Sequence, residues 1–192
     1  MDFITNILKA IVSAIFKIEI KGTENIPDTG SCVVCINHIS LFDPLVIYKS
    51  VERPIIFIGK QELFKIPVIG WFLKSINVIP VKRGSGDIGA VKAALKTLKD
   101  GGVLGIFPTG TREKKNPNAD VKGGAAMIAL KAGAPVIPIN IKATYRIFSK
   151  VYITVGKPVD LSEFEGRKLS QEEFVSASEK IFNNIKSLGD NK

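Results

Sequence analysis

The chain has 192 residues, of which 45% are hydrophobic, and it carries a formal net charge of +9 at pH 7. This length and apolar content support one domain with a substantial core and exclude two full-sized domains. The positive charge favours an acidic partner, which includes nucleic acid, an anionic membrane, a phosphorylated substrate and an acidic carrier protein, and it does not choose among them.

The first segment, residues 1–17, has the pattern of an amphipathic helix. Its apolar residues recur at three- and four-residue spacing, namely Phe3, Ile4, Ile7, Leu8, Ile11, Val12, Ile15 and Phe16. It is too short and too polar on one face to span a bilayer, which needs about 20 apolar residues. It also lacks the features of a signal peptide. We therefore expect a helix that lies in a membrane interface or packs on the core, and the pattern leaves both open.

The following residues, 18–192, alternate between short apolar runs and helical patterns. The apolar runs predict strands at residues 18–21, 32–37, 55–59, 77–81, 103–107, 136–141 and 151–155. The clearest helical patterns cover residues 87–98, 124–132 and 171–188. This alternation predicts a single α/β domain with a mostly parallel sheet of roughly seven strands flanked by helices. Its active site is expected where the strands end.

Cys32 and Cys35 form a C-x-x-C pair, which elsewhere indicates a redox pair or half of a zinc site. Here both lie in one apolar run, and a separation of three residues along a strand points the two sulfurs to opposite faces. We therefore predict two buried free thiols. Because the chain has one histidine and no further cysteine, ligands for zinc are scarce, and we expect no metal or cofactor.

His38 is the only histidine and follows the strand predicted at residues 32–37. Histidine is the side-chain type that ordinarily exchanges protons near neutral pH, which makes His38 the candidate general base. Asp43 precedes Pro44 at the start of a predicted helix, so it fits either a plain helix cap or a carboxylate that orients the His38 ring. Ser40 is expected to turn the loop rather than to act as a nucleophile.

Two more polar clusters follow predicted strands. One cluster consists of two cations, Lys82 and Arg83. The other combines two hydroxyls, a glycine and an arginine, and consists of Thr109, Gly110, Thr111 and Arg112. Each alone fits an ordinary surface or turn. A parallel sheet, however, gathers its strand ends along one edge, and a turn of this composition suits an anion or an oxyanion.

Taken together, these residues resemble the glycerolipid acyltransferase family, which includes bacterial 1-acyl-glycerol-3-phosphate acyltransferase. The matching segments are residues 37–43 for the N-H-x4-D motif, 60–71 for K-x-E-L-F-x-x-P-x-x-G-W, 79–83 for an apolar strand followed by arginine, 107–112 for F-P-E-G-T-R and 136–139 for a final apolar motif. They occur in the family's order over roughly residues 20–160, so the resemblance covers most of the residues after the first helix.

The resemblance implies an acyltransferase domain at residues 18–192 that uses an acyl thioester of acyl carrier protein or coenzyme A. The acceptor would be the free sn-2 hydroxyl of 1-acyl-glycerol-3-phosphate, and the product phosphatidic acid. His38, held by Asp43, would act as general base for direct attack, without an acyl-enzyme. Another lysophospholipid or glycerol 3-phosphate is the alternative acceptor.

The resemblance also implies where the acceptor binds. Arg83 and Arg112, helped by Lys82, would grip its phosphate, because a guanidinium matches phosphate geometry. Backbone donors near Gly110 and Thr111 would stabilise the oxyanion.

Thr109 departs from the family pattern, which usually has glutamate at this position to help hold the glycerol part of the acceptor. Threonine keeps a hydrogen-bonding oxygen but loses the charge and about two bonds of reach. The departure bears on the acceptor and on the rate. It also leaves open a weakly active or inactive membrane-binding member of the fold.

A lysophospholipid acceptor implies contact with an anionic membrane surface. We expect the first helix and residues 63–74, which include Trp71, to supply it in a peripheral, monotopic arrangement at the cytoplasmic face of the cell membrane. Core packing is the alternative for both segments. A nucleic-acid partner is disfavoured, because the basic residues are scattered rather than interleaved with exposed aromatics.

Overall fold

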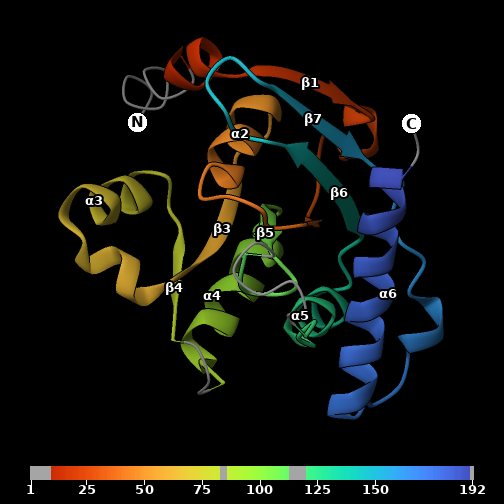
Figure 1. The fold of residues 1–192 in the computed structure, drawn as a ribbon. Coiled ribbons are helices and arrows are strands. Elements are labelled where there is room, and N and C mark those ends of the chain that lie inside the picture. Colours follow the sequence, from red (N-terminus) through yellow and green to blue (C-terminus); the bar gives the residue numbers. More distant parts are fainter. Residues whose placement is uncertain (1–9, 83–85, 113–119, 191–192) are drawn as a thin grey trace.

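One sheet with the strand order β1-β7-β6-β2-β5-β3-β4 organises the chain (Figure 1). The computed structural model describes residues 10–82, 86–112 and 120–190. Its strands are β1 (Lys17–Lys21), β2 (Cys32–Ile36), β3 (Ile55–Lys60), β4 (Ile79–Val81), β5 (Val103–Ile106), β6 (Val136–Ala143) and β7 (Lys150–Val155). Each overlaps a predicted strand, because runs rich in Val and Ile between Gly and Pro fit a buried pleated sheet better than a helix.

The strands run in two directions. β6, β2, β5, β3 and β4 are mutually parallel, whereas β7 is antiparallel to β6 and β1 is parallel to β7. The predicted α/β class with a mostly parallel sheet is therefore confirmed. As a consequence of the reversal, the amino ends of β7 and β1 lie at the same edge as the carboxyl ends of the other five strands.

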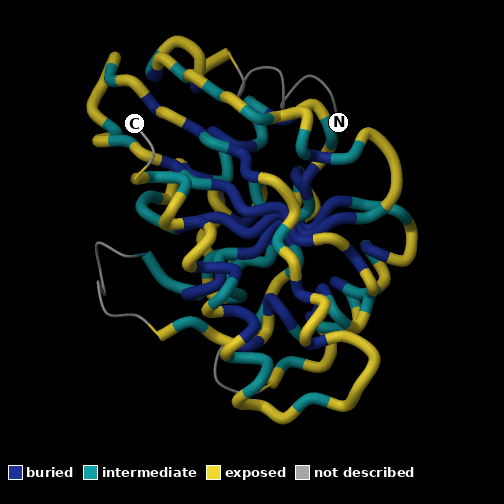
Figure 2. Tube along the Cα trace, turned by 90° about the vertical axis from the view of Figure 1, so that its right-hand side faces the viewer, coloured by how far each residue is buried: buried dark blue, intermediate teal, exposed yellow. Residues whose placement is uncertain are grey.

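Helices cover both faces of this sheet. They are α2 (Asp43–Ser50), α3 (Pro67–Ser75), α4 (Ile88–Lys99), α5 (Gly124–Ala132) and α6 (Gln171–Asp190), with short 3-10 turns at η1 (Thr23–Asn25), η2 (Gln61–Lys65) and η3 (Ser162–Phe164). Apolar residues of α4, α5 and α6 form one core cluster against the sheet, and those of α2 and of the helical residues 10–15 contribute to the other. The central strands between the two layers, β2 and β5 above all, form the buried centre of the molecule (Figure 2).

Local signals account for the ends of several helices. The Asp87 carboxylate accepts a hydrogen bond of 3.1 Å from the amide of Ala90 and caps α4. Ser170 and Glu173 exchange two side-chain to backbone hydrogen bonds before and within the first turn of α6, which is a capping box. The hydrogen bond from the Ser170 amide, together with the one from Arg167, lowers the pKa of Glu173 below its usual value.

The first helix is described from residue 10 onward, and residues 1–9 lie outside the described part. Val12 and Phe16 are buried in the core, whereas Ile11 is 47% exposed. The described turns of this helix therefore pack on the core through one side and leave an apolar side chain on the surface. Among the described residues, no helix is both long enough and apolar enough to cross a bilayer.

The two cysteines are free and buried on opposite faces of the sheet, as predicted. Cys32 belongs to the core cluster shared with α2, and Cys35 belongs to the cluster under α4, α5 and α6. Burial raises the pKa of the Cys35 thiol to about 12. Burial also raises the pKa of Cys32, and the nearby Arg53 guanidinium opposes this shift. Both thiols are therefore held in the unreactive, protonated form.

Candidate active site

Asn37 fixes the point at which the chain leaves β2. Its side-chain nitrogen donates to the carbonyl of Ile141 at 2.9 Å, and its side-chain oxygen accepts from the amide of Ile141 at 2.7 Å. The asparagine thus continues the hydrogen-bonding pattern between β2 and β6 with a side chain. The backbone of the next residue, His38, is free to turn away from the sheet at its carboxyl edge.

His38 and Asp43 form a hydrogen-bonded pair in the loop that follows. The Nδ1 atom of His38 lies 2.8 Å from Oδ2 of Asp43, and the Asp43 side chain is fully buried. The same oxygen accepts hydrogen bonds from the amides of Ile39 at 2.7 Å and Ser40 at 2.8 Å. A buried carboxylate with several donors is held in one orientation, so it fixes the imidazole ring in turn.

The alternative of Asp43 as a plain helix cap is wrong. The cap position of α2 is Phe42, which has no side-chain cap bond, and Asp43 is the first helical residue. Its carboxylate turns back to the loop before the helix instead of toward the amides of the next turn. Ser40 turns the loop as predicted, because its hydroxyl oxygen accepts from the amide of Phe42 at 3.2 Å.

Tyr145 completes the set of groups that hold Asp43, and the sequence did not reveal it. Its hydroxyl donates to Oδ1 of Asp43 at 2.6 Å. Burial, together with the neighbouring carboxylate, raises the pKa of Tyr145 well above its usual value, so the phenol stays protonated and remains a donor. Tyr145 comes soon after β6 ends, as His38 does after β2, and this position is the one signal that the sequence offers.

Phe107 fixes the plane of the His38 ring. It follows β5, the neighbour of β2, and stacks on the imidazole with ring centres 4.1 Å apart and an angle of 25°. Behind it lies the buried ring of Phe57, at 5.8 Å and 14°. The imidazole is therefore held by a hydrogen bond along its edge and by stacked rings on one face, and its side chain remains 15% exposed.

The third predicted cluster lies in the turn that begins at Phe107, the residue stacked on His38. Thr109 is buried, and its hydroxyl donates to the carbonyl of Thr111 at 2.9 Å. Gly110 adopts φ of 62°, a left-handed conformation that glycine adopts readily, and its amide donates to the carbonyl of Phe107. Arg112 is half-buried at the end of the turn. The hydroxyl of Thr109 thus serves the turn itself in this structure.

The second predicted cluster lies farther along the edge. Lys82 follows β4, which is three positions from β2 in the sheet, so about 14 Å of strand spacing separates the two strand ends. Its side chain is exposed, and its amide donates to the Asp87 carboxylate. Arg83 lies outside the described residues. His38 and Asp43 are in direct contact, whereas Lys82 belongs to the same edge without touching them.

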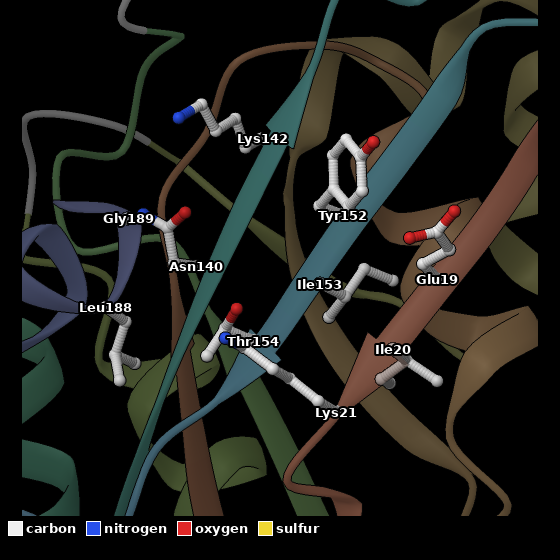
Figure 3. Close-up of a pocket in the computed structure, with 10 residues that line it drawn as sticks. All are labelled: Glu19, Ile20, Lys21, Asn140, Lys142, Tyr152, Ile153, Thr154, Leu188 and Gly189. Carbon is white, nitrogen blue, oxygen red and sulfur yellow. The ribbon is translucent and has the colours of Figure 1, made fainter. Parts of the chain in front are cut away.

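A hollow of about 470 Å³ lies elsewhere, over strands β1, β7 and β6 and beside the last turn of α6 (Figure 3). Side chains such as Glu19, Lys142 and Tyr152 surround it, and it contains none of the predicted site residues. The residues that line it include no histidine that could act as a general base. Within residues 10–82, 86–112 and 120–190, no group of three or more His, Cys, Asp or Glu side chains is placed to hold a metal ion.

Comparisons with known proteins agree with this arrangement. A family model described as Acyltransferase matches residues 17–142. The chain is 33% identical to a 1-acyl-sn-glycerol-3-phosphate acyltransferase of Borreliella burgdorferi, over 80% of this chain and 67% of that protein. It is 30% identical to the protein of the same name from Bacillus subtilis, over 97% of this chain and 95% of that protein.

A solved structure has the same fold. The crystal structure of the 1-acyl-sn-glycerophosphate acyltransferase from Thermotoga maritima superposes with a TM-score of 0.70 at 27% sequence identity. The match covers 98% of this chain and 81% of that one.

Proposed function

The chain belongs to the acyltransferase family, and on that premise we propose that it transfers an acyl group from a thioester to the sn-2 hydroxyl of 1-acyl-sn-glycerol-3-phosphate. The product is phosphatidic acid, and the donor is acyl carrier protein or coenzyme A loaded with a fatty acid. One observation carries the proposal, namely the 2.8 Å contact between His38 Nδ1 and Asp43 Oδ2 at the carboxyl end of β2. The named relatives support the choice of acceptor.

His38 is the proposed general base. In the proposed mechanism Nδ1–H donates a hydrogen bond to the Asp43 carboxylate, so Nε2 is the nitrogen that accepts a proton from the acceptor hydroxyl. The hydroxyl oxygen attacks the thioester carbonyl and forms a tetrahedral intermediate. The carbon–sulfur bond then breaks, and the thiolate leaves with the proton that His38 returns. The step needs no covalent enzyme intermediate, and the buried cysteines are unsuited to form one.

The turn after β5 is the proposed site of charge stabilisation. The amide of Gly110 donates to the carbonyl of Phe107 within the turn, so the amide of Thr111 is the proposed oxyanion donor. A single oxyanion donor contributes roughly 3 kcal/mol to transition-state stabilisation. Arg112, with Lys82 and Arg83 farther along the edge, is proposed to bind the acceptor phosphate through charge-assisted hydrogen bonds.

The acceptor is a membrane lipid, so we propose a peripheral association with the cytoplasmic face of an anionic membrane. The net charge of +9 supports it. Exposed apolar side chains on α3, among them Ile69 and Trp71, give further support. An apolar contact combined with basic residues is the usual requirement for stable binding at a lipid surface.

A direct assay tests the reaction. Purified protein is mixed with acyl carrier protein or coenzyme A thioesters and with 1-acyl-sn-glycerol-3-phosphate, glycerol 3-phosphate or another lysophospholipid at equal concentrations. Phosphatidic acid is expected as the main product. Preference for another acceptor would overturn the substrate proposal, and no transfer to any acceptor would favour an inactive member of the fold.

Thr109→Glu tests the departure from the family pattern. Thr109 is buried and hydrogen-bonded within its turn, and a longer carboxylate is proposed to replace that bond with one to the acceptor. If the chain is an active enzyme in which Thr109 sets the acceptor, this substitution is expected to change the rate or the acceptor preference. An inactive scaffold would remain inactive.

A further inference from the structure

Five exposed apolar side chains belong to the segments that meet next to the His38 and Asp43 pair. We call them the apolar rim; they are Ile11, Leu41, Phe42, Ile147 and Phe148. Ile147 and Phe148 are adjacent in the connection between β6 and β7, and their side chains are 74% and 69% exposed. Water-exposed apolar side chains that gather in one region mark an interaction surface.

Direct contacts join the three segments that carry the rim. Phe16, at the end of the first helix, packs edge-on against Phe42 at 5.4 Å and against Tyr145 at 5.3 Å. The amide of Phe148 donates to the carbonyl of Ile15 at 2.7 Å. Figure 1 shows the β6–β7 connection beside the helical residues 10–15, as the reversed direction of β7 and β1 requires.

The backbone of the β6–β7 connection is strained in a way that keeps Phe148 outside. Tyr145 and Phe148 have φ of 54° and 62°, values that bulky side chains rarely adopt and that Asn or Gly accept readily. Tyr145 uses this conformation to reach Asp43. Phe148 uses it to remain exposed. A strained backbone that holds an aromatic side chain 69% exposed favours a role for that side chain outside the fold itself.

Cations flank these apolar side chains. Arg146 is exposed and immediately precedes Ile147, and the exposed Lys17 immediately follows Phe16 at the start of β1. Lys150 lies there too, but it forms an ion pair of 2.7 Å with Glu19. Apolar side chains bordered by basic ones fit the boundary between the acyl chains and the headgroups of an anionic membrane.

We propose that the apolar rim inserts into the surface of an anionic membrane and holds the His38 and Asp43 pair at the level of the lipid headgroups. The inference rests on the proposed function for its choice of lipid acceptor. Phe42 immediately precedes Asp43, and Tyr145, which binds Asp43, lies two residues before Ile147. A lysophospholipid therefore reaches the base by lateral movement out of the bilayer, without crossing water.

Vesicle binding tests this inference without any need for turnover. The full chain is sedimented with vesicles of equal parts phosphatidylcholine and phosphatidylglycerol. Phe148→Asn accepts the left-handed backbone, so it should fold, and it is expected to weaken binding about tenfold, since one buried aromatic side chain is lost from the lipid. Ile147→Asn with Phe148→Asn should weaken it about a hundredfold. Arg146→Gln should weaken it about fivefold, and only with the anionic lipid.

The matched control is Ile88→Asn. Ile88 is also 69% exposed, but it lies at the start of α4, the helix that follows β4 at the far end of the strand order from β1. Its replacement should leave vesicle binding unchanged, and circular dichroism confirms the fold of every variant. Undiminished binding of the double variant would overturn the inference. So would a double variant that binds vesicles normally but loses affinity for acyl carrier protein, because the rim would then serve the donor. Failure of acyl transfer alone would overturn only the proposed function.

Discussion

The phenol of Tyr145 donates a 2.6 Å hydrogen bond to Oδ1 of Asp43, a residue 102 positions earlier in the chain. The other carboxylate oxygen, Oδ2, binds His38. Asp43 is thus held from both sides, by the loop after β2 and by the connection after β6. Tyr145 acts through Asp43 rather than on substrate, so we regard it as a positioning residue.

Tyr145→Phe removes this bond and leaves the ring. The buried carboxylate then lacks one donor, which costs about 1–3 kcal/mol when a charged group is involved. We expect kcat to fall roughly tenfold while KM changes little, because the acceptor and the donor bind elsewhere. Steady-state acyl-transfer kinetics provide the measurement.

Tyr152→Phe is the control, because Tyr152 lies on β7, and its side chain is on the face of the sheet with the hollow of Figure 3. It should leave kcat unchanged. In an Asp43→Asn background, Tyr145→Phe should have little further effect. An equal loss in both backgrounds would mean that Tyr145 supports the fold and not the orientation of Asp43.

Gly105→Ala tests the ring stack behind His38. An added Cβ at Gly105 would lie 2.6 Å from the ring of Phe57, which is itself buried and packs against Phe107. The displaced rings should shift the imidazole, lower kcat, and reduce the free energy of unfolding by about 1–3 kcal/mol. Chemical denaturation and kinetics measure the two effects. Gly124→Ala is the control, since nothing lies within 4 Å of an added Cβ there. If Gly105→Ala is destabilised but turns over at the normal rate, the stacked rings do not contribute to catalysis.

Cys35 predicts a loss of stability at alkaline pH. Burial raises the pKa of its thiol from 9.0 to about 12, so the folded chain keeps the proton while the unfolded chain loses it. The free energy of unfolding should therefore fall as pH rises from about 9 toward 12, by up to roughly 4 kcal/mol from this group. Cys35→Ala should show a shallower decline over that range in denaturant titrations. Identical slopes for both proteins would show that the thiol is not held protonated.

Trp71 reports on the second proposed membrane contact. It is the only tryptophan of the chain, and its side chain on α3 is 56% exposed. If α3 lies at the lipid surface, anionic vesicles should shift its fluorescence to shorter wavelength, because the indole leaves water. The Phe148→Asn variant, mixed with saturating vesicles, is the comparison. Vesicle binding without any shift would restrict membrane contact to segments other than α3.

The strands and the main helices could be predicted because their signals are local. Alternating or continuous runs of Val and Ile define β2 or β6 without reference to any other segment. Strand direction has no such signal, since an apolar run reads alike in a parallel and an antiparallel strand. The reversal of β7 and β1, which brings the β6–β7 connection to the active edge, therefore appeared only in the structure.

The site was predictable only in part, for a related reason. The sequence placed His38 and Asp43 five residues apart but allowed Asp43 to cap a helix, and the amides of Ile39 and Ser40 decide which way the carboxylate turns. Tyr145 is distant in sequence and belongs to no motif, so only the packing of β6 beside β2 brings it to Asp43. Thr109 was expected to face the acceptor, and this expectation stays a prediction.

The central claim is that His38, oriented by Asp43, removes the proton from the acceptor hydroxyl. The most direct test is single-turnover transfer from an acyl thioester to 1-acyl-sn-glycerol-3-phosphate by folded His38→Ala, beside the unmodified chain and Asp43→Asn. The rate is expected to fall by about a thousandfold or more for His38→Ala, as for the loss of a general base. Transfer by folded His38→Ala at the rate of the unmodified chain would contradict the claim.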